Sequence, residues 1–401
     1  MTEESLDRLV GSREIGVCCG SGGVGKTSVA AAIALGAAAR LGGRVLVLTI
    51  DPARRLATAL GLEGIGNEAR RVPDAVVAAA VGAPPRGELW AAMLDMKQSW
   101  DDLVRTHAED EATAERILEN RLYRNLTSRF VQSHDYIAME RLFEIHSAGE
   151  YDLIVIDTPP TRNAIDFLEA PARMAEFFGG RFLRWLTLPY RVGGRRGSRV
   201  LELASRPFSQ LADRILGGAF LEDIGEFFAN FQSMYDGFVA RAEAVERLLH
   251  DRRTTFAVVT TLEPAPLHEA ERFCAALGER DLHLGALVCN RTLPDLLLDP
   301  EAAAAAATCR LEADVVAAEL GAARVPGLED PRRVARVLRI VGESFDRFAV
   351  VARREAELRR ELAGGPEVVA RVPALAGDVG DVDALAAIAR HLFSERAPEG
   401  P

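Results

Sequence analysis

Six short stretches of the chain are apolar along almost their whole length, which distinguishes them from the half-polar pattern of surface strands. They are Glu14–Cys19, Arg44–Ile50, Tyr151–Ile156, Thr255–Thr261, Leu284–Cys289 and Glu367–Val372. Strands of this kind are typical of a sheet that is covered on both faces. The first is followed by a glycine-rich turn, an alanine-rich helical segment (Thr27–Arg40) and the second strand. This order predicts an α/β fold with a mostly parallel, doubly wound sheet.

Three long intervals contain no clear strand and are expected to be helical. They are Leu89–Glu150, Ala164–Asp251 (interrupted by a loop at Pro189–Ser198) and Pro300–Leu362. The sequence has no internal repeat. We therefore expect one domain over residues 1–401, with residues 89–150 and 164–251 inserted as a helical subdomain.

Composition narrows the class of protein. Of the 401 residues, 48% are hydrophobic and 27% charged, an ordinary balance for a globular protein. The formal net charge of −11 argues against a nucleic acid or anionic membrane held by bulk electrostatics. The first ten residues are acidic and polar, unlike a signal peptide, so a cytoplasmic location is expected. The five cysteines include no C-x-x-C pair, which argues against a disulfide framework or a structural zinc site.

The turn after the first strand reads GSGGVGKTS, from Gly20 to Ser28. Glycines let backbone N–H groups crowd around a phosphate, and the following helix directs its positive end there. The phosphate-binding residues predicted by this P-loop pattern are Gly22, Gly23, Val24, Gly25, Lys26, Thr27 and Ser28. Lys26 would reach the β- and γ-phosphates and Thr27 would ligate Mg²⁺. Only two lysines occur in the chain, and one stands at this position. The alternative interpretation of Gly20–Ser28 is a chance glycine-rich turn.

Two aspartates stand where buried strands end. Asp51 follows the second strand and Asp157 follows the third. Ligands of open α/β sheets bind at the carboxyl ends of strands, so both carboxylates are expected near the phosphates. One would hold Mg²⁺ through water and the other would orient an attacking water. The alternative for each is a helix N-cap.

These motifs together resemble the ArsA-type ATPases, which include the arsenite-pump ATPase and the ATPase that delivers tail-anchored membrane proteins. The matching segments are GSGGVGKTS, LTIDPARRLATAL, YDLIVIDTPPTRNAIDFL and TLEP…LVCNR, in the family's order. The resemblance extends over the whole chain. It is strongest to an actinobacterial-type branch of poorly understood role.

The resemblance implies ATP and Mg²⁺ as ligands and gives roles to individual residues. Asp51, in switch I, would activate the hydrolytic water, so the catalytic residues would be Asp51 and Lys26. Switch II would be Asp157, Thr158, Pro159, Pro160 and Thr161, and Mg²⁺ would lie at Thr27 and, through water, Asp157. Asn290 would read adenine with its amide, with Arg291 and the segment Val372–Leu375, including Pro373, beside it. From its position alone, Asn290 would be a turn residue at the end of a strand.

One departure from the family pattern bears on activity. The family's signature lysine, which crosses a dimer interface to the partner's phosphates, is replaced here by Ser21. Three explanations stay open: an arginine substitutes (Arg55 first, or Arg54 or Arg162), a paralogue supplies the lysine in a heterodimer, or hydrolysis is slow. Since there is one P-loop, the chain would need a second chain, identical or paralogous, to form the dimer.

Two apolar stripes could receive a hydrophobic client or a membrane protein, as the family's insertions do. The first comprises Phe177, Phe178, Phe182, Leu183, Trp185, Leu186 and Leu188, and the second Phe227, Phe231, Met234, Tyr235 and Phe238. Packing within the helical subdomain is the simpler interpretation of both. Likewise, Arg191, Arg195, Arg196 and Arg199 form a basic loop that is better explained as solvated than as a docking site.

The expected function is therefore that of an ATPase coupling Mg·ATP turnover to a membrane-related partner or hydrophobic client. The alternative is a regulatory or scaffold subunit that binds nucleotide with little turnover, as Ser21 suggests. A third class, the ATPases that position DNA or division sites, ranks below both because Leu385–Phe393 is too short and too weakly basic for a membrane-targeting helix.

Overall fold

The computed structural model describes most of the chain. The described residues are 6–50, 55–120, 123–124, 131–158, 227, 234, 237–323, 326–328, 330–362, 365–375 and 377–393, without the side chains of 55, 131–136 and 361–362. The expected Asp51, Pro159, Pro160 and Thr161 lie outside these residues, as do Arg54, Arg162, the stripe Phe177–Leu188 and the arginines of the loop at 189–198 and Arg199.

An eight-stranded sheet forms the centre of the fold, in the order β3-β4-β2-β5-β1-β6-β7-β8. All neighbouring strands are parallel except the β3–β4 pair. The strands are β1 (Ile15–Cys19), β2 (Gly43–Thr49), β3 (Arg70–Arg71), β4 (Gly87–Met93), β5 (Leu153–Asp157), β6 (Thr254–Thr260), β7 (Leu284–Thr292) and β8 (Val368–Pro373). The six strands expected from apolar runs are all present, and the mostly parallel α/β prediction is confirmed.

Two strands were not anticipated, and one corrects the helical assignment of the interval that begins at Leu89. Residues Leu89–Met93 belong to β4, which pairs in parallel with β2 from Gly43 to Thr49. The alanines and the partly exposed Trp90 give β4 a weak apolar signal, so its pairing with β2 decides its conformation. β3 has two exposed arginines and no sequence signal at all.

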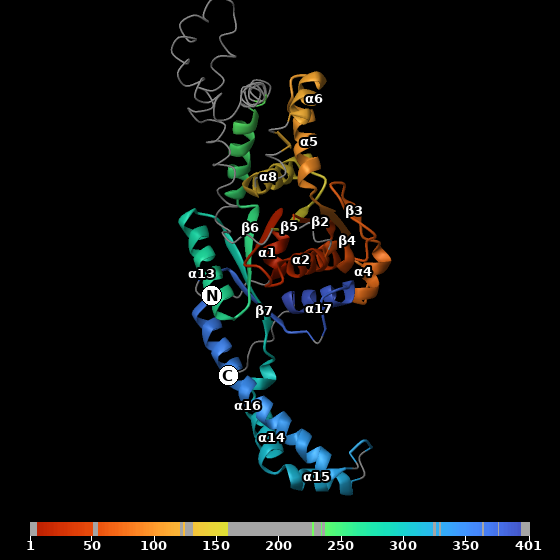
Figure 1. Cartoon of the computed structure of the whole chain (residues 1–401), viewed down its shortest axis with the longest axis vertical. Coiled ribbons are helices and arrows are strands. Elements are labelled where there is room, and N and C mark those ends of the chain that lie inside the picture. The colour runs from red at the N-terminus through yellow and green to blue at the C-terminus, as the bar shows by residue number, and fades with distance from the viewer. Residues whose placement is uncertain are drawn as a thin grey trace, which may run out of the picture.

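Helices cover both faces of the sheet, as Figure 1 shows. One face is packed by α1 (Leu6–Gly11), α2 (Lys26–Arg40), α4 (Asp74–Val81) and α17 (Val382–Leu392), with α3 (Arg55–Ala59) contributing Leu56. The other face is packed by α8 (Val131–Ala148), the helical residues 237–249 and α13 (Pro264–Glu279). Alternate strand residues serve the two cores, since Val17 lies in one and Cys18 in the other.

A smaller helical core sits at one end of the molecule. It joins α5 (Met96–His107), α6 (Glu111–Glu119), part of α8 and residues 237–242 around Trp100 and Phe238. Phe227, Met234 and Phe238, from the second apolar stripe, are buried here. For these three residues the structure supports core packing, not a client surface; Phe231 and Tyr235 lie outside the described residues. No helix of the described part is long and apolar enough to cross a membrane.

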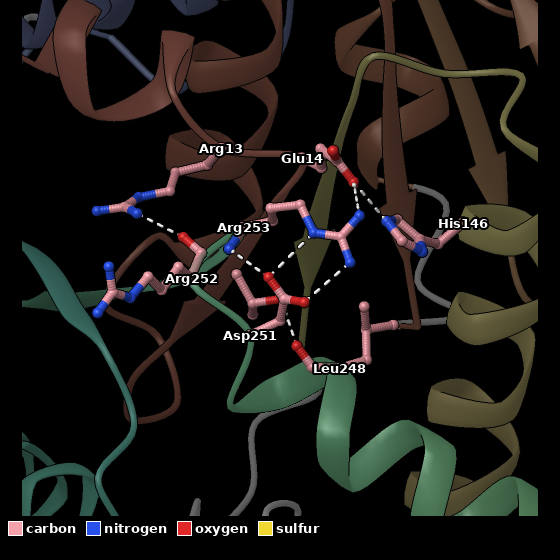
Figure 2. A network of polar contacts seen from close by, with 8 residues as sticks. Arg13, Glu14, His146, Leu248, Asp251, Arg252 and Arg253 are labelled. Carbon is pink, nitrogen blue, oxygen red and sulfur yellow. Dashed lines mark hydrogen bonds and ion pairs between the residues drawn. The ribbon is translucent and has the colours of Figure 1, made fainter.

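A polar network joins the starts of two central strands to the end of α8 (Figure 2). Glu14, before β1, contacts His146 Nε2 at 2.8 Å and accepts a hydrogen bond from Arg253 Nη1 at 3.2 Å. Arg253 also binds both oxygens of Asp251, and these hydrogen bonds lower the pKa of Asp251 to about 2. The network holds together the N-terminal ends of β1 and β6, and the glycine-rich turn lies at the opposite end of β1.

A helical hairpin extends away from the sheet at the opposite end of the molecule from α5 and α6 (Figure 1). After β7 and the 3-10 turn η1 (Asp295–Leu298) come α14 (Pro300–Leu311), α15 (Ala313–Ala322) and the 32-residue α16 (Pro331–Leu362), which leads to β8. The face of α16 that is covered, chiefly by α14 and α15, has a seven-residue repeat of mostly small residues: Ala335, Leu338, Gly342, Phe345, Ala349, Ala352 and Ala356. Small residues let helices approach closely.

Gly342 is the point of closest approach, which makes it a test of the hairpin. A Cβ there would lie 2.5 Å from the carbonyl oxygen of Ala306 and 2.9 Å from Cβ of Arg310, both on α14. Gly342→Ala should therefore lower the free energy of unfolding by about 1–2 kcal/mol despite alanine's better helix propensity. Urea unfolding followed by circular dichroism measures this change. Gly321→Ala in α15 is the matched control, since its Cβ meets only Pro331 Cγ at 3.6 Å; equal effects of the two substitutions would contradict the close packing.

Candidate functional site

The glycine-rich turn connects β1 to α2 at the centre of the sheet. It leaves β1 between β5 and β6 and enters α2 at Lys26, with Gly25 as the N-cap residue. The chain goes from β1 toward β2 on one side, and from β6 to β7 on the other, so the turn lies where strand order reverses. Crevices at such a point, outside the carboxyl ends of strands, are the usual ligand sites of α/β sheets.

Two glycines of the turn are required by close contacts. Gly20 has φ +149°, and a Cβ on it would lie 2.1 Å from the carbonyl oxygen of Val259 in β6. Gly25 has φ +92°, and its Cβ would lie 2.4 Å from Nδ2 of Asn290. Side chains at either position would push the turn off the strand ends, so the loop can sit this deep only with glycine there.

Lys26 turns its side chain back into the loop. Only 6% of the residue is exposed, and its Nζ donates a hydrogen bond of 2.8 Å to the carbonyl oxygen of Ser21. The ammonium is thereby held inside the ring of backbone that precedes α2, next to the N–H groups of the helix's first turn. This combination of a fixed cation and the N–H groups of the first helical turn can bind the phosphates of a nucleotide.

Asp157 at the end of β5 is fully buried and receives two hydroxyl groups on one oxygen. Thr27 Oγ1 donates to Asp157 Oδ2 at 2.6 Å and Thr49 Oγ1 donates to the same atom at 2.9 Å. A threonine hydroxyl that gives its hydrogen to a carboxylate keeps its oxygen lone pairs for a metal. Thr27 and Asp157 are thus a donor set suited to Mg²⁺, an ion that binds protein through few oxygens and retains water. Sequence analysis missed Thr49; its signal was a hydroxyl residue two positions before Asp51, at the end of a buried strand.

Thr158 ties the start of the expected switch II to β1. Its hydroxyl donates to the carbonyl oxygen of Cys18 at 2.9 Å, and its N–H lies 3.3 Å from the same atom. The thiols of Cys18 and Cys19, beside this contact, are buried. Burial raises the pKa of Cys18 well above its usual value, and the charge of Asp157 raises it further. Burial also raises the pKa of Cys19 to about 12, against the opposing effects of Thr158 and Lys26.

Asn290 lies against the glycine-rich turn itself. Its Nδ2 donates to the carbonyl oxygen of Val24 at 2.7 Å, and its Oδ1 accepts from the N–H of Arg291 at 3.0 Å. Arg291 adopts a left-handed conformation with φ +56° and is exposed. Pro373 of β8 pairs with Thr292 of the adjacent strand β7. The three residues expected at the adenine, Asn290, Arg291 and Pro373, therefore gather at neighbouring strand ends beside the loop.

Ser21, at the position of the family's signature lysine, directs its hydroxyl inward. Its Oγ is buried and forms no hydrogen bond with any described residue. Arg55 begins α3, but its side chain is outside the described part, so the substitution of an arginine for the lysine stays a prediction. The structure brings Thr27, Asp157, Lys26, Asn290 and the glycines together, whereas Asp51 and residues 159–161 of the expected switch II lie outside the described residues.

Comparison with known proteins agrees with this arrangement. Residues 14–316 match the family model of the anion-transporting ATPases (ArsA_ATPase). An uncharacterised protein of Streptomyces coelicolor is 31% identical over 278 residues, which are 69% of this chain and 62% of that protein.

Two further relatives carry functional names. ATPase GET3 of Malassezia globosa is 24% identical over 291 residues, covering 69% of this chain and 72% of the relative. A putative arsenical pump-driving ATPase of Chlorobaculum tepidum is 24% identical over 284 residues, covering 68% of this chain and 60% of the relative. The family model spans the glycine-rich turn, Asp157 and Asn290, which the sheet brings together with the turn after β1 lying between β5 and β7. The chain therefore belongs to the anion-transporting ATPase family.

Proposed function

We propose that the protein binds Mg·ATP and hydrolyses its terminal phosphoanhydride bond. The observation that carries the proposal is the cluster at the start of α2, where Lys26 lies inside the loop and Thr27 donates to the buried Asp157. Helix N–H groups, one cation and a hydroxyl–carboxylate pair are the parts that phosphoryl transfer requires, since its catalysis depends on positioning and on neutralising charge.

Each residue has a separate part in this proposal. Lys26 would exchange its hydrogen bond to the Ser21 carbonyl for the β- and γ-phosphate oxygens. Thr27 would hold Mg²⁺ directly, and Asp157 would hold it through water while keeping the Thr27 hydroxyl oriented. Mg²⁺ supplies charge neutralisation at the phosphate oxygens. Asp51, which follows the last residues of β2, would orient the attacking water for in-line displacement.

Asn290 would select adenine as the base. An amide can pair with N6 and N7 of adenine, and here it is already placed beside the phosphate loop by its bond to the Val24 carbonyl. Arg291 and Pro373 would line the same base from the ends of β7 and β8. The close contact of Asn290 with Gly25 supports one compact site for base and phosphates.

The working unit would be a dimer, either of identical chains or with a paralogous ATPase. Ser21 cannot place a positive charge on a partner's phosphates, and its hydroxyl is turned inward. An arginine such as Arg55, Arg54 or Arg162 would then replace the signature lysine, or the paralogue would supply it. In either case, switch I and switch II would couple the γ-phosphate to the angle between subunits.

The energy of turnover would serve a membrane-related partner or a hydrophobic client in the cytoplasm. Relatives named ATPase GET3 and arsenical pump-driving ATPase support this class of function. A second candidate, a nucleotide-binding regulatory subunit with little turnover, is favoured by one observation, the serine at position 21.

Asp51→Asn should separate nucleotide binding from turnover. The amide keeps the size of the side chain but cannot accept a proton from the attacking water, so the hydrolysis rate should fall by about 10²–10⁴-fold. ATP affinity, measured by titration with a fluorescent analogue, should be unchanged. Lys26→Ala is the contrasting variant, expected to weaken ATP binding by about 10–100-fold through loss of a charge-assisted contact. Normal hydrolysis by Asp51→Asn would refute the switch I assignment.

Asn290→Ala should reduce discrimination between ATP and GTP. Loss of the bidentate contact removes about 1–3 kcal/mol of base selectivity, whereas loss of the bond to the Val24 carbonyl weakens both nucleotides equally. The ratio of the two dissociation constants therefore reports on base reading alone. An unchanged ratio would show that Asn290 only supports the loop.

Turnover measured against protein concentration, with mass determined with and without ATP, distinguishes the two candidate functions. We expect the rate per chain to rise with concentration as an ATP-dependent dimer forms, because two chains complete each site. Tight ATP binding by a persistent monomer with negligible turnover would instead favour the regulatory subunit, and addition of a paralogous ATPase carrying the lysine should then restore hydrolysis.

A further inference from the structure

Helix α16 has a second apolar stripe besides the one that packs on α14 and α15. It consists of Val337, Ile340, Val341, Phe348 and Val351, and we refer to it as the α16 seam. These side chains are 52%, 56%, 53%, 53% and 48% exposed. At 100° per residue, the seam is centred about 110° around the helix from the covered face. The arrangement differs from scattered exposed apolar residues, which are normal on any surface.

The spacing of the seam is that of a helix-packing surface. Val337, Val341, Ser344, Phe348 and Val351 follow one another at alternating intervals of four and three residues. This repeat places one narrow apolar line along the helix, which is the pattern of a coiled-coil contact. On one side, the apolar line adjoins the face of α16 that α14 and α15 cover. A partner helix can therefore approach only from the opposite side of the line, which we call the open border.

Arginines occupy the open border. Positions 333, 340, 347 and 354 recur every seven residues along it and carry Arg, Ile, Arg and Arg. The side chain of Arg347 is 81% exposed, with Glu343 at 3.9 Å, and that of Arg354 is 62% exposed, with Glu357 at 3.1 Å. Helix α16 as a whole contains nine arginines and five acidic residues in a chain of net charge −11. Helix α16 thus has an excess of positive charge beside the seam, whereas the chain as a whole is negative.

A second copy of α16 does not fit this border. If two copies of α16 pair antiparallel with their seams in contact, Arg333 of each helix lies opposite Arg354 of the other. Like charges at such positions are destabilising. A parallel pair would need the border that α14 and α15 already cover. A bilayer is a poorer match as well, because interfacial helices present a broader apolar face than this line with Ser344 in its middle.

We propose that the α16 seam docks an amphipathic α-helix of a partner protein, with an apolar seven-residue repeat and acidic flanking residues. The partner's apolar side chains pack on Val337, Val341, Phe348 and Val351, and its carboxylates meet Arg347 and Arg354. The site is separate from the nucleotide site, so the inference goes beyond ATP hydrolysis and does not depend on it.

Two synthetic helical peptides, each three heptads long, test the proposal with the full chain. They share one apolar seam and differ only in their flanking residues, glutamate in one and lysine in the other. Fluorescence anisotropy should show saturable binding of the glutamate peptide and none of the lysine peptide. Val341→Asp with Phe348→Asp should weaken the glutamate peptide by about tenfold or more, and Arg347→Glu with Arg354→Glu should do the same.

Val350→Asp is the matched control, because Val350 is 60% exposed on α16 yet lies about 140° around the helix from the middle of the seam. It should bind the glutamate peptide like the unchanged protein. Absence of binding, or equal loss in the control, would overturn the proposal. So would seam-dependent self-association in mass measurements, which identifies a second copy, or seam-dependent binding to phosphatidylglycerol vesicles, which identifies a membrane. ATP turnover measured on the same samples reports separately on the proposed function.

Discussion

The double hydrogen bond on Asp157 Oδ2 is the contact on which the arrangement of the site depends. It joins the first turn of α2, the end of β2 and the end of β5 through two threonine hydroxyls and one buried carboxylate. A buried charge is costly unless it is hydrogen-bonded, so neither threonine can be replaced by an apolar residue without leaving the carboxylate poorly satisfied. The loop before α2 is fixed independently by Val259 and Asn290, which leave space only for glycine.

Much of this could be predicted from the sequence because the core signals are local. The buried parallel strands are apolar along their length, and the loop motif has its strand and helix on either side. β4 and β3 were missed for a physical reason: β4 derives its conformation from pairing with β2, and an edge pair with two arginines has no apolar pattern to detect. The hydrogen bond of Thr49 with Asp157 joins residues 108 positions apart, and the sequence alone does not predict that these two side chains meet.

Ser21 shows how a family pattern and a local geometry can give different information. The resemblance identifies the position as that of a lysine that crosses between subunits. In the structure, the carbonyl of Ser21 accepts from Lys26 while its hydroxyl is buried. The residue therefore contributes to its own loop through its backbone, a role that any side chain could leave intact. The serine therefore leaves the hydrogen bond between Lys26 and the loop backbone intact, and its consequence lies in what one chain would offer another in the proposed dimer.

The helical hairpin of α14, α15 and α16 is inserted between two neighbouring strands of the sheet, β7 and β8. α14 leaves from β7 and α16 returns to β8. The base of α16 is held by Glu355, which accepts from the N–H of Leu293, and by Leu358, which packs against the cluster of Leu262, Leu267 and Cys289. A straight helix of this length measures about 48 Å, at 1.5 Å per residue. It is stiffened along its length by small-residue packing on its neighbours. The two strands that carry the hairpin, β7 and β8, also contain Asn290 and Pro373, so the hairpin is connected directly to the residues of the proposed base site.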